Sequence, residues 1–133
     1  MFKVLKNSWA LFTGIGIMMI AHGLQGNLMA VRSVLENFNV VTTGIFMSGY
    51  YVGYFLGSRT TPILVSKVGH IRVFAAFASM ASLSVLIVVV FVNPVVWTIA
   101  RFITGLSLVS CYIVAESWLN DRATNKNRGQ LLS

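Results

Sequence analysis

Four apolar stretches, each long enough to cross a lipid bilayer, dominate this sequence. They cover roughly residues 9–31, 44–65, 73–92 and 95–119. A transmembrane helix needs about 20 mainly apolar residues to cross about 30 Å of hydrocarbon. Only 10% of the 133 residues are charged, whereas soluble proteins carry about 25%. We therefore predict an all-α membrane protein, with four transmembrane helices in a single domain over residues 1–133 and a tail over residues 120–133.

The basic residues indicate how these helices are oriented. Two lysines precede the first stretch, and the other basic residues outside the spans fall mostly on the same side. That side holds Lys3, Lys6, Lys67, Arg72, Arg122, Lys126 and Arg128, and the opposite side holds Arg32 alone. Because cytoplasmic loops are enriched in Lys and Arg, we predict that both ends of the chain are cytoplasmic. The net charge of +7 is explained by this asymmetry, so nucleic acid is not an expected partner.

No pattern typical of an enzyme is visible. The sequence has no cluster of metal ligands, no glycine-rich phosphate loop and no set of nucleophile, base and acid. Its single cysteine, Cys111, lies in an apolar run and permits no internal disulfide. We therefore expect no enzymatic activity, no metal and no cofactor.

The fourth stretch contains the most informative residue, Arg101. At 100° per residue, Arg101 shares a helix face with Gly105 and Tyr112. A charge at depth in lipid costs about 2.5–3.5 kcal/mol, so Arg101 should face the bundle interior or a water-filled cavity. Glu116 lies about 22 Å further along the axis, at 1.5 Å per residue, too far to be its partner. Arg101 is therefore either part of a structural ion pair or a residue that handles solute or protons.

Other polar and aromatic residues in the spans are candidates for the same cavity. His22 and Gln25 lie three residues apart in the first stretch, and Tyr50 and Tyr54 lie one turn apart in the second. Hydrogen bonding between helices and aromatic packing would explain both pairs. The alternatives are a proton-carrying histidine and a lined cavity.

The second stretch has glycines at four-residue spacing, Gly49, Gly53 and Gly57. A face without side chains lets another helix backbone approach closely. Gly105 is a candidate for the same kind of contact. These glycines serve either plain helix packing or a sliding interface in a moving protein.

Two segments resemble signatures of a known transporter superfamily. Residues 62–72 read P-I-L-V-S-K-V-G-H-I-R, and residues 101–105 read R-F-I-T-G. They resemble G-x-x-x-D-R/K-x-G-R-R/K and R-x-x-x-G of the major facilitator superfamily of secondary transporters. The matching residues are Lys67, Gly69, Arg72, Arg101 and Gly105, and the departures are Pro62, Ser66 and His70. The longer strings V-G-H-I-R-V-F-A and A-E-S-W-L-N-D-R-A-T-N-K-N-R-G are similar to a bacterial branch, the YcaD-like transporters.

The resemblance implies secondary active transport of a small solute by alternating access, with proton coupling as an option, in the inner membrane of a bacterial cell. Each six-helix half of such transporters is built from two three-helix repeats. Four helices are one repeat and the first helix of the next, so we expect an N-terminal part whose partners are the remaining helices. The alternatives are a complete four-helix exporter acting as a dimer, and a membrane anchor subunit that transports nothing.

The resemblance also implies a cytoplasmic gate. Glu116 ends the fourth stretch on the same side as a basic loop that we predict over residues 66–72, which contains Gly69. We expect Glu116 to pair with Lys67, Arg72 or Arg128 and to close the cytoplasmic ends of the second and fourth helices. A partly dehydrated pair at a membrane surface is stronger than an exposed pair, which is worth only about 0–1 kcal/mol.

Overall fold

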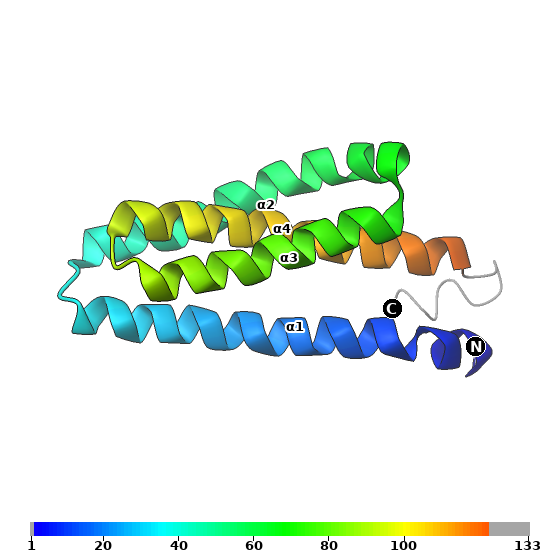
Figure 1. Cartoon of the computed structure of the whole chain (residues 1–133), viewed down its shortest axis with the longest axis horizontal. Coiled ribbons are helices and arrows are strands. Elements are labelled where there is room, and N and C mark those ends of the chain that lie inside the picture. Colours follow the sequence, from blue (N-terminus) through cyan, green and yellow to red (C-terminus); the bar gives the residue numbers. More distant parts are fainter. Residues whose placement is uncertain (1, 123–133) are drawn as a thin grey trace.

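The computed structural model describes residues 2–122, and within that range the chain forms four helices and no strand. They are α1 (Phe2–Leu35), α2 (Val40–Val68), α3 (His70–Val90) and α4 (Pro94–Arg122). Figure 1 shows them side by side with short connections, so that consecutive helices run in opposite directions. The predicted all-α fold is confirmed.

The helices extend further than the apolar stretches from which they were predicted, except that α3 ends at Val90, before the predicted end at residue 92. The predicted basic loop over residues 66–72 is wrong, because α2 continues to Val68 and α3 begins at His70. Gly69 alone joins them, with a φ of 95° that side chains rarely allow. Its amide still bonds to the carbonyl of Val65, 3.0 Å away. Hydropathy marks the part of a helix that lies in hydrocarbon, whereas the hydrogen-bonded backbone continues beyond it.

Short polar side chains fix the two other connections. The side chain of Asn39 accepts a 2.7 Å hydrogen bond from the amide of Thr42 and so caps the start of α2. Asn93 accepts a 2.8 Å bond from the amide of Val95 at the start of α4. Both residues satisfy helix amides that would otherwise have no partner.

α4 is the central helix of the bundle. It packs most extensively against α2 and next against α3, whereas α1 has few contacts with the other helices. In Figure 1, α1 runs along one side of the group formed by α2, α3 and α4. The structure is therefore a tight three-helix group with a more loosely attached first helix.

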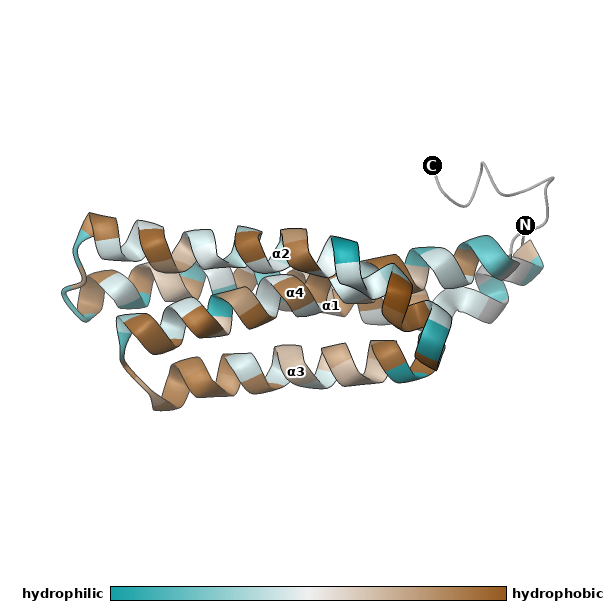
Figure 2. Cartoon of the chain, turned by 90° about the horizontal axis from the view of Figure 1, so that it is seen from above, coloured by the Kyte–Doolittle hydropathy of each residue, from teal (hydrophilic) through white to brown (hydrophobic). Residues whose placement is uncertain are grey.

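Three helices in the described part of the chain are long and apolar enough to cross a membrane, over Ser8–Leu35, His70–Val90 and Pro94–Asp121. In Figure 2, hydrophobic residues predominate along α3. α2 is not among the three, although it has 29 residues, as α4 does. Its glycine, tyrosine and hydroxyl side chains make it less apolar. The predicted span over residues 44–65 therefore rests on the length of α2 and its packing along α4.

The contact between α2 and α4 is a close approach of two backbones. A Cβ atom on Gly53 would overlap the carbonyl of Phe102, and one on Gly105 would overlap the carbonyl of Tyr50. A Cβ on Gly49 would lie 2.9 Å from the carbonyl oxygen of Thr98, and one on Gly57 would overlap the side chain of Val109. The predicted packing glycines thus all lie at this interface.

Buried hydroxyl groups link α4 to both of its neighbours. The oxygens of Thr61 on α2 and Ser110 on α4 lie 2.6 Å apart. Those of Ser84 on α3 and Thr104 on α4 lie 2.9 Å apart. Such bonds between membrane helices contribute about 0.6 kcal/mol on average. They add to the packing and fix the rotation of α4 relative to its neighbours.

Candidate functional site

Arg101 lies on the first half of α4 and is only 6% exposed. Its guanidinium carbon lies 4.9 Å from the centre of the Tyr50 ring on α2. The imidazole of His22, on α1, stacks on that same ring, with centroids 4.9 Å apart and an angle of 18° between the planes. Tyr50 thus connects residues from three helices into one cluster.

This cluster holds several buried polar atoms without a hydrogen-bond partner among the described residues. They are Nε and Nη1 of Arg101 and Nδ1 of His22, and Nε2 of Gln25, three residues from His22 on α1, is unpaired too. Oγ of Ser107, further along α4, also has no partner. Most buried polar groups in proteins are hydrogen-bonded, and leaving one unpaired costs about 1–3 kcal/mol. The unpaired groups on Arg101, His22 and Gln25 therefore make this cluster a candidate binding site.

A cavity of about 320 Å³ lies between α1, α3 and α4, and His22 is the member of the cluster that lines it. His22 and Gln25 contribute its polar lining on α1, and Thr104 contributes on α4. The rest of the wall is mainly apolar and includes Met18, Phe74, Val85 and Leu108. Small-molecule sites are commonly cavities of this kind, with apolar walls and a few polar groups.

Two further tyrosines that we predicted for the cavity lie at its margin. The ring of Tyr54 lies 6.1 Å from that of Tyr50, and Tyr54 is 41% exposed. Tyr112 is half-buried on α4, about three turns beyond Arg101. The structure therefore brings Arg101, His22 and Tyr50 into contact and places Gln25 beside His22 in the cavity wall. Tyr54 and Tyr112 belong neither to these contacts nor to the cavity lining.

Sequence reasoning missed two members of the site. The ring of Tyr51 lies 5.4 Å from that of Tyr50 at an angle of 89°. Thr104 follows Arg101 by three residues on α4, is buried and lines the cavity. That spacing was a usable signal, because polar residues at three-residue intervals lie near one another on a helix.

The predicted gate residues lie at the opposite end of the bundle from Arg32. Glu116 is exposed and makes no ion pair with Lys67 or Arg72 in the described part of the chain. Both basic residues are exposed on helix ends. Arg128, the other predicted partner, lies outside the described residues. The observed contacts between α3 and α4 at this end involve His70 instead, whose Nε2 lies 2.9 Å from Oγ of Ser117 and 3.5 Å from Oδ2 of Asp121.

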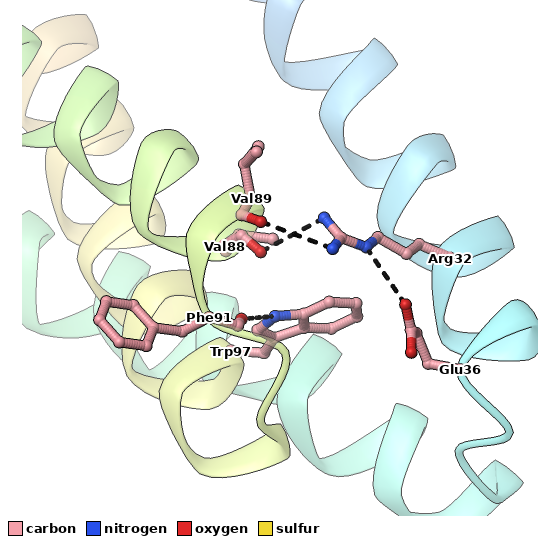
Figure 3. Close-up of polar contacts among 6 residues, drawn as sticks. All are labelled: Arg32, Glu36, Val88, Val89, Phe91 and Trp97. Atoms are coloured by element: carbon pink, nitrogen blue, oxygen red, sulfur yellow. Dashed lines mark hydrogen bonds and ion pairs between the residues drawn. The ribbon is translucent and has the colours of Figure 1, made fainter.

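A second polar cluster ties α1 to the rest of the bundle at the end that holds Arg32 (Figure 3). The guanidinium of Arg32 donates 3.5 Å hydrogen bonds to the carbonyls of Val88 and Val89, which end α3. It lies 5.7 Å from the centre of the Trp97 ring and 3.8 Å from the carboxylate of Glu36. A cation at the C-terminus of a helix also interacts favourably with the helix dipole. This contact attaches α1 at one end.

The described residues include no group of three or more His, Cys, Asp or Glu side chains placed to hold a metal ion. Cys111 is buried and unpaired. The unpaired polar groups around Tyr50 are therefore the strongest candidate for a functional site in residues 2–122.

The chain is similar to curated transporters of bacterial origin. The relatives include the protein named "Uncharacterized MFS-type transporter YcaD" in Escherichia coli O45:K1 (strain S88), O81 (strain ED1a) and O139:H28 (strain E24377A). Each is 25% identical over 126 residues, which cover 92% of this chain and 32% of the relative. The chain thus spans about a third of the length of these relatives. No solved structure matches it significantly.

The model of the family described as "Sugar (and other) transporter" matches residues 3–133. This match and the similarity to MFS-type transporters assign the chain to a known class of transporters. The signatures around Gly69 and Arg101 led us to expect this class. Such proteins cross the bacterial inner membrane several times. The chain therefore belongs to the sugar (and other) transporter family, within the major facilitator superfamily.

Proposed function

We propose that this chain forms part of a secondary transporter that moves a small solute by alternating access, with the solute bound beside Arg101. One arrangement carries this assignment: a buried guanidinium with two unpaired nitrogens contacts the Tyr50 ring, and His22, which stacks on that ring, lines a cavity of about 320 Å³. Intramembrane charges face a cavity or a partner and often mark solute or ion pathways. A purely structural arginine would be expected to have a hydrogen-bond acceptor in the bundle.

The arrangement of the helices supports alternating access. α1 is attached at the Arg32 end and has few contacts elsewhere, whereas α2, α3 and α4 pack tightly. Transporters of this class work by rigid-body movement of one group of helices against another around a fixed site. The tightly packed α2, α3 and α4 could move as one group relative to α1, which contributes His22 and Gln25 and is attached more weakly.

Proton coupling is a second part of the proposal. His22 is the only histidine within the predicted spans, and its ring stacks on Tyr50, which also contacts Arg101. Gain of a proton by His22 would place a second positive charge near Arg101, and the two charges would repel each other. An anion bound beside Arg101 would offset this repulsion. Proton binding at His22 and binding of the anion would therefore favour each other.

Transport by the full-length protein tests the assignment. Membrane vesicles with and without the protein are incubated with a mixture of small metabolites, and uptake is measured by mass spectrometry. We expect at least one solute to accumulate only with the protein, and Arg101→Ala to reduce that uptake at least tenfold at normal expression. Lys6→Ala is the control, because it removes an exposed charge far from the cavity. Normal uptake by Arg101→Ala would make Arg101 a structural residue.

A further inference from the structure

No acidic side chain in residues 2–122 serves as a counter-ion for Arg101. The sequence contains only three acidic residues, Glu36, Glu116 and Asp121. Glu36 lies near Arg32, Asp121 lies near His70, and Glu116 is exposed near the end of α4. The contact of Arg101 with the Tyr50 ring is a cation–π interaction, worth about 2 kcal/mol when desolvated, and it supplies no acceptor for the unpaired N–H groups. The negative charge must therefore come from another molecule or from another part of the transporter.

The unpaired atoms around Tyr50 define what chemistry would satisfy them. Nε and Nη1 of Arg101 and Nε2 of Gln25 are all hydrogen-bond donors. An ionised carboxylate has two oxygens that only accept hydrogen bonds, and it also neutralises the guanidinium charge. A neutral polyol could accept the same hydrogen bonds but would leave a buried charge uncompensated. A cation would be repelled.

The cavity next to the cluster limits the rest of the ligand. Its walls carry Met18, Phe74, Val85 and Leu108, while its polar lining includes His22 and Gln25, which also belong to the cluster. A ligand with its charged end at His22 and Gln25 would therefore place its body among apolar side chains. A cavity of about 320 Å³ is at the small end of the range for ligand sites.

We propose that Arg101 and Gln25, flanked by His22 and Tyr50, form a carboxylate-binding site, and that the transported solute is a small monocarboxylate with an apolar body. This inference rests on the proposed transport function and specifies its substrate class. The same chemistry could also come from an acidic side chain elsewhere in the transporter. The structure favours the solute, because two unpaired residues of the cluster line a cavity that has room for an apolar body.

Ligand binding to the purified full-length protein tests the proposal. The probes are four monocarboxylates: benzoate, phenylacetate, isovalerate and octanoate. Benzamide, phenylacetamide, isovaleramide and octanamide are matched in shape but carry no charge, and glucose represents a neutral polyol. The measurement is the melting temperature at increasing ligand concentration, since a ligand that binds only the folded state stabilises it by mass action.

We expect at least one carboxylate to raise the melting temperature in a saturable manner, and its amide and glucose to have no effect. Arg101→Gln should abolish this shift. Arg101→Lys should weaken binding at least tenfold, because it keeps the charge but loses the planar guanidinium. Gln25→Ala and His22→Gln leave Arg101 in place and should each reduce affinity, which guards against a misfolded Arg101 variant. Lys6→Ala should bind as the unchanged protein does.

Two results would overturn the proposal. If none of the four carboxylates shifts the melting temperature, or if the amides shift it equally, the site does not recognise a carboxylate. If Arg101→Gln lowers the melting temperature without ligand and a second substitution of an acidic residue elsewhere restores it, an internal carboxylate is the partner. Uptake of a neutral solute in the vesicle assay would then leave the transport function standing while the substrate class fails.

Discussion

The indole nitrogen of Trp97 donates a 2.7 Å hydrogen bond to the carbonyl oxygen of Phe91 (Figure 3). Trp97 is fully buried on the first turn of α4, and Phe91 directly follows the last residue of α3. The Trp97 ring also lies under Arg32 of α1 and contacts the ring of Phe46 on α2, with centroids 5.3 Å apart. One side chain therefore contacts all three other helices or the residues that flank them.

Trp97→Phe should destabilise the bundle at this end. The substitution leaves the carbonyl of Phe91 without its donor and removes part of a buried ring, which we expect to cost about 1–3 kcal/mol. Thermal unfolding of the full-length protein in detergent measures the effect. Trp9→Phe is the matched control, because Trp9 is 65% exposed. Equal melting temperatures for the two variants would show that the Trp97 contact contributes little.

Gly53→Ala should weaken the contact between α2 and α4. Its new methyl group would overlap the backbone of Phe102, and a backbone cannot move aside as a flexible side chain can. Gly44→Ala, in the first turns of the same helix, meets nothing within 4 Å and should be neutral or slightly stabilising, because alanine favours helix by about 0.5–1 kcal/mol over glycine. We expect Gly53→Ala to lower the melting temperature and Gly44→Ala to leave it unchanged or raise it slightly. A similar small change in both would argue against close packing at Gly53.

The orientation predicted from the basic residues can be tested with single cysteines. Cys111, which is buried, is first replaced by serine. A cysteine at position 36 should then react with a membrane-impermeant reagent added outside the cell, and cysteines at positions 6 and 70 should react only after the membrane is opened. The physical reason is the excess of Lys and Arg on the side of His70. Labelling at position 70 from outside would reverse the orientation.

The gate prediction concerns a state in which Glu116 pairs with the basic residues near Gly69. In the structure Glu116 is exposed and unpaired with Lys67 or Arg72, so we expect the pair only when the cytoplasmic ends of α2 and α4 are closed. Glu116→Arg and Arg72→Glu should each shift the population towards inward-open states, and the double variant should restore transport. Transport and cytoplasmic accessibility of the cavity are measured for all three. If each single change is harmless, Glu116 is a solvated helix end.

The sequence was most informative about features that a single physical requirement determines. The length of each apolar stretch predicts a helix, because every backbone group in lipid must be paired within the segment. The burial of Arg101 followed from the cost of a charge in hydrocarbon. In both cases, knowledge of the neighbouring helices is not required.

The sequence was less informative where the outcome depends on the rotation of helices against one another. Which ring would contact Arg101 depends on the close packing of Gly53 against Phe102 and of Gly105 against Tyr50, and the glycines alone do not indicate this. The pairing expected for Glu116 concerned exposed groups near a helix end, whose interaction is worth only about 0–1 kcal/mol. Such weak preferences do not determine a geometry. The helix ends were missed because hydropathy reports on lipid contact rather than on backbone hydrogen bonds.

The central position of α4 has a consequence for the order in which the chain can assemble during synthesis. Gly105 is made about 50 residues after Gly53, which corresponds to roughly 3–10 s at about 5–20 residues per second. During this interval the glycine face of α2 has no partner, and α3 lacks the helix against which it mainly packs. The main helix contacts of the bundle can therefore form only after the ribosome has produced α4. If the ribosome stalls before Pro94, the inserted product contains α1, α2 and α3 but lacks α4, the helix against which α2 and α3 mainly pack.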